Sequence, residues 1–301
     1  MAVGYARAMR YDLLAIDLDG TLLGPGAVLS PANAEAVDRA RRSGLRVVVC
    51  TGRGLAECRP FLDALGQRDP VIVAGGAVTA DPVSGATIDR FVMDPGLVGR
   101  VAGVLLEAGH AVLVLKDAGA TGYDYLVLTG DDGIEPDPVT LWWFERMRVR
   151  VRSVRTLDDD PDPGDTVRVG LCTDARVSDA LAGVLRARFG DEIILHSFKA
   201  VVSSRTDADG GRTVNILEAF DPAGGKWAAL DRLARRWGVP RARIAAVGDE
   251  INDLEMIRSA GLGVAMGNAI GAVRDAADRV APPHDADGVA WAIDRILEGA
   301  W

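Results

Sequence analysis

Three short apolar stretches, separated by helical patterns, constrain the fold of the N-terminal part of this chain. The stretches cover residues 13–16, 45–50 and 71–74, and the second is rich in β-branched residues. Two helical patterns separate them, at about 31–43 and 55–65. Strands and helices that alternate at this spacing predict a parallel sheet with right-handed crossovers. In such sheets ligands bind at the carboxyl ends of the strands.

The same alternation of strands and helices returns near the C-terminus, after a middle region with a different pattern of predicted elements. Helical patterns at about 225–237 and 285–297 flank an apolar strand at 244–247. The middle region has short strands between turn clusters, with helical patterns near 97–108 and 177–189. We therefore predict an α/β protein with two domains. Residues 1–81 and 214–301 form a Rossmann-like parallel-sheet core, and residues 82–213 form an inserted α/β cap domain.

Composition limits the classes of partner and the compartment. The 301 residues carry 43 acidic and 34 basic side chains, a net charge of −9 that disfavours nonspecific nucleic-acid binding. No apolar run approaches the ~20 residues of a membrane span. Residues 1–9 have no signal-peptide core, and we interpret them as a loose leader, with Met9 as an alternative start. Three cysteines without CxxC spacing suit a reducing compartment. We expect a cytoplasmic monomer or homodimer without a membrane or nucleic-acid partner.

Two carboxylates end the first apolar stretch. Asp17 and Asp19 stand one residue apart, and strand residues at i and i+2 point to the same face. At neutral pH the two charges would repel each other unless a cation or a shared proton relieved them. For an isolated pair of this kind, a polar strand end that caps the following turn is the favoured interpretation.

Further polar residues stand at comparable places, each at the end of a strand or the start of a helix. They are Thr51, Lys226 and the acidic stretch 249–253. Each alone would be read as a helix cap or as charge complementing a helix dipole. The chain has only three lysines, however, so Lys226 is less readily attributed to chance. In combination these residues predict a cation site of carboxylates beside an anion site made of a hydroxyl, an ammonium and backbone amides.

These residues give the sequence a specific resemblance to the haloacid dehalogenase (HAD) superfamily of phosphohydrolases, in the Cof-like branch with a type IIB α/β cap. The four motifs of that superfamily occur in order as DLDGT at 17–21, TGR at 51–53, Lys226 within GGKWAAL, and GDEIND at 248–253. The stretches AMGNA at 265–269 and DGVAWAI at 287–293 also agree. The motifs lie only in the predicted core. The predicted cap resembles the caps of this branch in its length and in its pattern of short strands and helices.

The resemblance implies a catalytic role for each of four residues. Asp17 would attack phosphorus and become an aspartyl phosphate, and Asp19 would act as general acid and then general base. Thr51 would hydrogen-bond a phosphoryl oxygen, and Lys226 would neutralise negative charge on the phosphoryl group. The dehalogenases of the superfamily lack a carboxylate at the place of Asp19, so its presence favours phosphate chemistry.

The resemblance also implies a Mg²⁺ site and a phosphate cradle. Mg²⁺ would be held by the Asp17 carboxylate, the Asp19 carbonyl and the Asp249 carboxylate. Asp253 would orient the lysine and the metal-bound waters without binding the ion itself. The phosphate would be bound by Asp17, Gly20, Thr51, Gly52, Lys226 and Asn252.

The implied activity is Mg²⁺-dependent hydrolysis of small phosphorylated metabolites, such as sugar phosphates or similar monoesters. Two alternatives stay open: a phosphotransferase or phosphomutase of the same superfamily, and a non-catalytic regulator that binds a phosphometabolite. One residue departs from the branch. Gly75 stands where Cof-like proteins usually carry Asn, and this removes an amide near the phosphate entrance.

Other signals in the sequence receive structural interpretations. The Gly224-Gly225-Lys226 stretch does not fit a P-loop, and residues 207–218 do not fit an EF-hand and predict a hairpin turn between cap strands. The aromatic run 142–144 is expected in the core of the cap, with a substrate platform or a dimer contact as alternatives. For Arg168, and for His196 and Lys199, a solvated strand face is the default and substrate selection the alternative.

Overall fold

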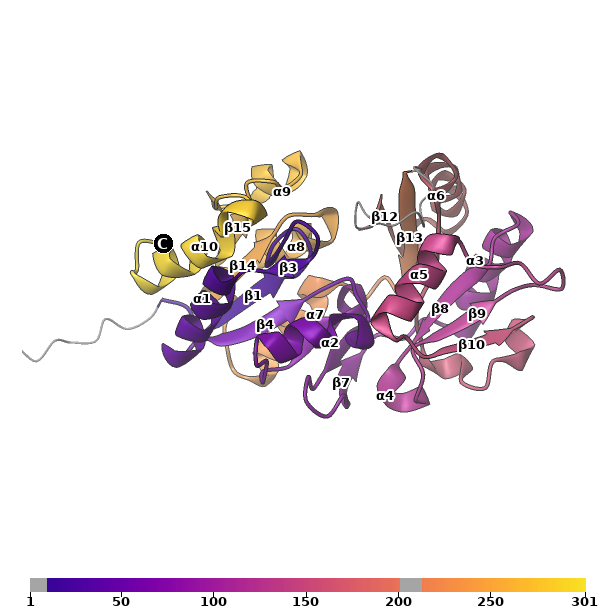
Figure 1. The fold of residues 1–301 in the computed structure, drawn as a ribbon, viewed down its shortest axis with the longest axis horizontal. Helices are drawn as coiled ribbons and strands as arrows, with labels where there is room; N and C mark the ends of the chain where they lie inside the picture. The colour runs from indigo at the N-terminus through magenta and orange to yellow at the C-terminus, as the bar shows by residue number, and fades with distance from the viewer. Residues whose placement is uncertain (1–9, 201–212) are drawn as a thin grey trace, which may run out of the picture. The chain divides into compact units, whose positions relative to one another are not determined.

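The computed structural model describes residues 10–200 and 213–301, which form two compact units (Figure 1). Of the described residues, 10–50 and 230–301 belong to the first unit, and 51–200 and 213–229 belong to the second. The proposed cap, residues 82–213, is a part of the second unit. The expected leader, residues 1–9, and residues 207–212 of the stretch expected to hold a hairpin turn lie outside the described residues.

Five parallel strands form the sheet of the first unit, in the order β16-β15-β14-β1-β4. Their bounds are β1 Leu13–Asp17, β4 Arg46–Cys50, β14 Ile244–Gly248, β15 Leu262–Ala265 and β16 Arg279–Val280. All residues of β1 and β14 are buried, as an apolar run without alternation predicts for a parallel strand covered on both faces. The prediction of an α/β fold with a parallel sheet is confirmed.

Helices and a small hairpin complete the first unit. Their bounds are α1 Pro31–Arg42, α8 Leu254–Ser259, α9 Gly271–Ala276, α10 Gly288–Leu297, and the hairpin strands β2 Leu23–Gly24 and β3 Val28–Leu29. α7 (Lys226–Arg236) begins in the second unit and continues in the first. Ser30 caps α1, because its hydroxyl oxygen accepts a hydrogen bond from the Asn33 backbone nitrogen at 3.1 Å. The buried Asn33 amide joins α1 to its surroundings by donating to the Leu22 carbonyl and accepting from the Ala290 nitrogen.

The second unit begins with one helix and three antiparallel strands. The elements are α2 Leu55–Ala64, β5 Val71–Val73, β6 Val78–Ala80 and β7 Thr87–Arg90. A short 3₁₀ turn, Ala74–Gly76, joins β5 to β6. The strand β6 was not expected from the sequence, because it is short and Thr79 at its centre interrupts the apolar residues.

A six-stranded sheet forms the rest of the second unit, in the order β10-β9-β8-β11-β13-β12. Only the β10–β9 pair is parallel. The bounds are β8 Val112–Lys116, β9 Tyr125–Leu128, β10 Val151–Val154, β11 Thr166–Asp174, β12 Ile194–Lys199 and β13 Val214–Phe220. The helices are α3 Pro95–Glu107, α4 Ala118–Thr121, α5 Pro138–Met147 and α6 Ala175–Phe189.

The apolar faces of α3 and α6 pack on this sheet and form its core. The core includes Val101 and Leu105 of α3, Leu185 of α6, and Val114 and Leu171 of the sheet. Burial of apolar area of this kind stabilises the fold by about 25 cal/mol per Å². Among the described residues no helix is long and apolar enough to cross a membrane.

Candidate active site

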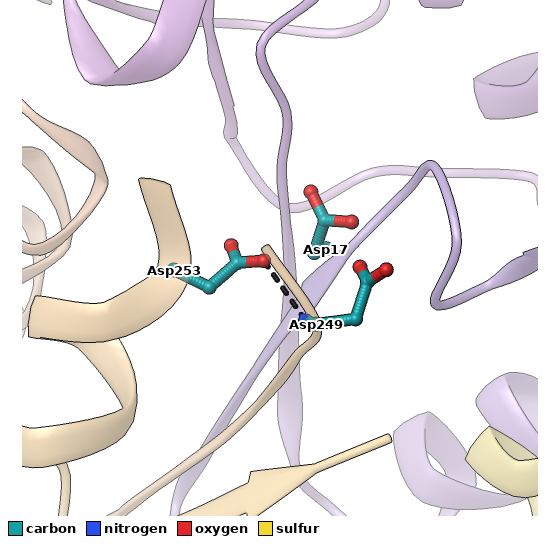
Figure 2. Close-up of side chains that lie close together, drawn as sticks. All are labelled: Asp17, Asp249 and Asp253. Carbon is teal, nitrogen blue, oxygen red and sulfur yellow. Dashed lines mark hydrogen bonds between the residues drawn. The ribbon is translucent and has the colours of Figure 1, made fainter. Parts of the chain in front are cut away.

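The carboxyl ends of two neighbouring parallel strands place the first group of site residues. Asp17 is the last residue of β1 and Asp249 directly follows β14. The two strands pair in parallel, with Ile16 opposite Val247, so these two aspartates emerge at the same edge of the sheet (Figure 2). On the other side of β1, Asp17 lies opposite Cys50, the residue that precedes Thr51.

Three carboxylates come together at this edge. Asp17, Asp249 and Asp253 each offer one oxygen, and these oxygens all lie within 4.8 Å of one another. Asp17 is 5% exposed and Asp253 is fully buried, so the two negative charges are largely removed from water. Buried carboxylates at this spacing repel one another, and a hard divalent cation with oxygen ligands would relieve the repulsion. The group can therefore hold a metal ion.

Asp253 also organises the loop that carries Asp249. Its Oδ2 accepts hydrogen bonds from the backbone nitrogens of Asp249 at 3.0 Å and Glu250 at 3.1 Å (Figure 2 draws the first). Gly248 permits this approach, since a Cβ at that position would lie 2.5 Å from Cγ of Asp253. One carboxylate oxygen of Asp253 thus fixes the direction in which Asp249 leaves β14. This geometry suits the orienting role predicted for Asp253, which stays a prediction.

The Asp249 carboxylate is held by two side chains to which the sequence assigned no role. Thr21 Oγ1 donates to Asp249 Oδ1 at 2.9 Å, and Asn268 Nδ2 donates to Oδ2 at 3.1 Å. The same Asn268 amide group donates to the Gly20 carbonyl at 2.8 Å. Thr21 belongs to the DLDGT motif and Asn268 to the AMGNA stretch. Their places in these motifs were the signal in the sequence that could have assigned them to the site.

Gly20 is required where the loop after β1 passes Asp249. Its φ is +76°, a left-handed conformation that residues with a side chain rarely adopt. A Cβ on Gly20 would lie 2.3 Å from Oδ2 of Asp249. The half-buried Asp19 precedes Gly20 in this loop, and Asn252 is in the 3₁₀ turn Ile251–Asp253.

Thr51 is fixed by three hydrogen bonds within the second unit. Its backbone nitrogen donates to the Ile72 carbonyl at 2.8 Å, and its carbonyl accepts from the Gly75 nitrogen at 3.0 Å. Its buried side-chain oxygen accepts from the Arg53 nitrogen at 3.1 Å. These bonds attach the TGR loop to the end of β5. The hydroxyl hydrogen of Thr51 is the group with which it would donate to a phosphoryl oxygen.

Lys226 is the first residue of α7 and is 1% exposed. The turn after β5 lies directly against the backbone of Gly225, the residue that precedes Lys226. Gly76 has a φ of +102°, and a Cβ there would lie 2.0 Å from the carbonyl carbon of Gly225. Gly75 has a φ of +67°, and a Cβ there would lie 2.8 Å from the Phe220 ring. The ring of Phe220 therefore occupies space that a side chain at position 75 would enter.

The predicted site residues are thus distributed over both units. The first unit carries Asp17, Asp19, Gly20, Asp249, Asn252 and Asp253, and the second carries Thr51, Gly52 and Lys226. Within the first unit the structure brings three of the carboxylates together. That both groups act on one phosphate stays a prediction.

A buried polar network in the second unit corrects the expectation for Arg168. The expected solvated strand face is wrong, because Arg168 is 6% exposed. Its Nη1 donates to the Gly52 carbonyl and forms an ion pair with Glu218, both at 2.7 Å, and Nη2 donates to the Tyr125 hydroxyl at 2.5 Å. The side chain is buried because three acceptors surround it.

Burial shifts the pKa values in this network. Burial raises the pKa of Glu218 to about 7, with Arg168 opposing the shift and the charge of Glu57 adding to it. Burial alone would lower the pKa of Arg168, but the Glu218 carboxylate raises it above its ordinary value, so the guanidinium stays charged. Burial also raises the pKa of Tyr125, which therefore stays a neutral hydroxyl.

The network continues through Tyr125 to the helix that follows the TGR loop. The Tyr125 hydroxyl donates to Glu57 Oε1 at 3.3 Å, and Trp143 Nε1 donates to the same oxygen at 2.9 Å. Of the aromatic run 142–144, Phe144 is buried against Tyr125, as a core role predicts. Trp143 instead reaches Glu57 and Arg53, residues that the sequence did not connect with it.

Comparisons with known proteins match this chain to a hydrolase family, to named phosphatases and to solved hydrolase structures. The sequence model of the haloacid dehalogenase-like hydrolase family matches residues 14–293. The 5-amino-6-(5-phospho-D-ribitylamino)uracil phosphatase YwtE of Bacillus subtilis is 30% identical over 305 residues, which cover 96% of this chain and 99% of that protein. The pyridoxal phosphate phosphatase YbhA of Escherichia coli is 27% identical and covers 94% and 97%. A haloacid dehalogenase-like hydrolase from Bacteroides thetaiotaomicron has a TM-score of 0.75 at 25% identity, with 95% and 99% covered.

Proposed function

Because this chain belongs to the haloacid dehalogenase-like hydrolases, in their Cof-like branch, and is a phosphatase of that superfamily, we propose that it hydrolyses small phosphomonoesters with Mg²⁺ through an aspartyl phosphate on Asp17. The observation that carries the proposal is the group of three carboxylates at the ends of β1 and β14. Asp17 is the last residue of β1 and the first residue of the DLDGT motif.

Two displacements at phosphorus make up the proposed reaction. An Asp17 carboxylate oxygen attacks phosphorus, the bond from phosphorus to the ester oxygen breaks, and Asp19 gives its proton to the departing alcohol. Asp19 then takes a proton from a water molecule, whose oxygen attacks phosphorus and breaks the bond to Asp17. Inorganic phosphate leaves, and Asp17 returns as a carboxylate.

The carboxylates of Asp17 and Asp249 and the carbonyl of Asp19 would hold the Mg²⁺ ion. All three are the oxygen donors that this small, hard cation prefers. When bound, the ion supplies positive charge that offsets the repulsion between the phosphate and Asp17. Thr21 and Asn268 fix the direction of the Asp249 carboxylate, and supports of this kind affect metal affinity.

The phosphoryl oxygens would be bound by Thr51, Lys226 and backbone amides. A donating hydroxyl, an ammonium and N–H groups suit an oxyanion whose charge grows as the bonds to phosphorus change. The amides and side chains we propose here are those of Gly20, Gly52 and Asn252. We infer from the order of the four motifs that these groups contact the same phosphate.

The substrate class we propose is a small metabolite phosphorylated on a primary alcohol. Its support is chemical: the substrates named for the two relatives, a phosphoribityl compound and pyridoxal phosphate, both carry phosphate on a CH₂–O group. We propose that sugar phosphates of this kind belong to the same range. We also propose action in the cytoplasm, as a monomer or homodimer, without a nucleic-acid partner.

The test is phosphate release from a panel of monoesters by the purified chain, with and without Mg²⁺. The panel would include 5-amino-6-(5-phospho-D-ribitylamino)uracil, pyridoxal phosphate, hexose 6-phosphates and p-nitrophenyl phosphate. We expect Mg²⁺-dependent turnover that Asp17→Asn abolishes. Turnover that survives Asp17→Asn would refute the covalent route. Transfer of the phosphoryl group to a second sugar would show a transferase, and thermal stabilisation by the panel without turnover would show a binding protein.

A further inference from the structure

One carbonyl of the TGR loop is held by a side chain from the six-stranded sheet. Arg168, on β11, donates from Nη1 to the Gly52 carbonyl at 2.7 Å. The sequence separation is 116 residues, so this contact exists only when the sheet is folded against the loop. Arg168 belongs to the proposed cap, whereas Gly52 directly follows Thr51, the residue proposed to bind the phosphoryl group.

The guanidinium that makes this bond is itself fixed. The Glu218 carboxylate binds Nη1 at 2.7 Å, and the Tyr125 hydroxyl accepts from Nη2 at 2.5 Å. All three side chains are buried. Charge-assisted hydrogen bonds in a buried site are strong, and the planar guanidinium has little freedom once both ends are bound. Arg168 therefore presents a rigid donor to the loop.

The peptide plane transmits this restraint to Thr51. The Gly52 carbonyl and the Arg53 N–H belong to one planar peptide unit, so fixing one fixes the other. That N–H donates to Thr51 Oγ1 at 3.1 Å. A rotation of the peptide would break the bond to Arg168 at one end and the bond to the Thr51 hydroxyl at the other.

The residues of the loop that follow this peptide are also held by contacts within the second unit. The Arg53 guanidinium lies over two rings, 5.0 Å from the centre of Phe61 and 4.9 Å from that of Trp143. The Gly54 nitrogen donates to Glu57 Oε2 at 2.5 Å. With its flanks held in this way, the peptide between Gly52 and Arg53 can respond to Arg168 without a shift of the whole loop.

We propose that Arg168 is a positioning residue of the phosphatase, which orients the Thr51 hydroxyl by holding the peptide between Gly52 and Arg53. The inference rests on the proposed function, in which Thr51 binds the phosphoryl group. Arg168 acts on the phosphoryl side of the substrate and not on the alcohol. Its loss therefore lowers the rate for every phosphomonoester by the same factor.

The experiment compares Arg168→Lys with Arg90→Lys in the full chain. Lysine keeps the positive charge but cannot bind Gly52, Glu218 and Tyr125 with a planar fork. Arg90 is the matched control, because it also bridges two acceptors of the second unit, Asp117 and Asp165, and has no contact with the loop among the described hydrogen bonds and ion pairs.

For Arg168→Lys we expect kcat/KM to fall about tenfold on p-nitrophenyl phosphate, a hexose 6-phosphate and pyridoxal phosphate alike. Inhibition by inorganic phosphate should weaken by a comparable factor, since the product contains only the phosphoryl side. Arg90→Lys should leave both quantities unchanged even where it lowers Tm. A loss that depends on the alcohol would overturn the inference, and so would an unchanged kcat/KM in Arg168→Lys.

A double-mutant cycle separates positioning from mere stabilisation. If Arg168 acts through Thr51, then Arg168→Lys costs little activity once Thr51→Val has removed the hydroxyl, and the two effects are not additive. Additive effects would refute a role through Thr51. If Arg168→Lys does not fold, Tyr125→Phe removes one acceptor from the guanidinium, and we expect a smaller loss, again uniform across substrates.

The same data distinguish this inference from the proposed function. No turnover by the wild-type chain, or full activity of Thr51→Val, would refute the proposed function itself. A large loss in Thr51→Val together with none in Arg168→Lys would refute only the role of Arg168.

Discussion

The substitution Glu218→Gln tests the electrostatics of the buried network through stability rather than activity. Glu218 is 5% exposed and pairs with Arg168 at 2.7 Å. Burial nevertheless raises its pKa from 4.5 to about 7, with Arg168 opposing and Glu57 adding to the shift. Glutamine has nearly the same shape and keeps an oxygen acceptor for Arg168, but it cannot ionise.

The sign of the effect follows from proton binding. Between the two pKa values the folded chain keeps the Glu218 proton while the unfolded chain has lost it, so the free energy of unfolding falls as pH rises. The loss is nearly complete one pH unit above the raised pKa. The difference between the raised pKa and its ordinary value corresponds to about 3 kcal/mol. Glu218→Gln lacks this term, so its stability relative to wild type should rise by about 2–3 kcal/mol from about pH 5 to about pH 8.

Urea unfolding of both chains at four pH values in this range measures the difference, and other titrating groups cancel in the comparison. Glu192→Gln is the control, because Glu192 also pairs with an arginine, Arg100, but is half exposed and its bond to Arg100 lowers its pKa. A difference between wild type and Glu218→Gln that stays flat would show that Glu218 is ionised throughout. A difference that shrinks with rising pH would reverse the sign and refute the reasoning.

Three further substitutions test the site and the turn after β5. Gly20→Ala would place a Cβ 2.3 Å from Oδ2 of Asp249, so we expect activity to fall at least ~100-fold and the Mg²⁺-induced rise in Tm to disappear; retention of both would contradict the described loop. Thr21→Val removes the hydrogen bond to Asp249 with little change of shape, and the Mg²⁺ concentration for half-maximal activity should rise about tenfold or more, whereas no rise would refute a support role. Gly75→Asn should destabilise by about 1–3 kcal/mol in urea unfolding, and Phe220→Leu in the same chain should recover part of that loss; equal stability of both variants would argue against a clash.

Elements with a strong apolar pattern were predictable, whereas short or exposed ones were not. The helix after Ser30 and the strand ending at Asp17 appear where the cap signal and the apolar run placed them. The strand Val151–Val154 was missed because most of its side chains are exposed and it therefore has no apolar run. The two-residue strands were missed for lack of length.

The carboxylate group was predictable because parallel strands bring their carboxyl ends to one edge, which makes Asp17 and Asp249 neighbours. The environment of Arg168, in contrast, could not be predicted from the sequence. An arginine on a strand reads as exposed, and only the pairing of β11 with β13 brings Glu218 to it, from 50 residues later in the chain. The contact between Gly75 and Phe220 could not be predicted either, because Phe220 approaches Gly75 only in the folded chain.

The close approach of Gly76 to Gly225 has a consequence for the order of folding. The carbonyl carbon of Gly225 would lie 2.0 Å from a Cβ on Gly76, so the backbones on either side of a long intervening segment meet without side chains between them. Closing so long a loop costs conformational entropy and slows folding, and a compact intervening segment brings the two ends closer together. During synthesis, we therefore expect the start of the helix that carries Lys226 to reach Gly76 after the intervening sheet has folded. Of the proposed phosphate-binding residues in the second unit, Thr51, Gly52 and Lys226, the lysine would reach its place last.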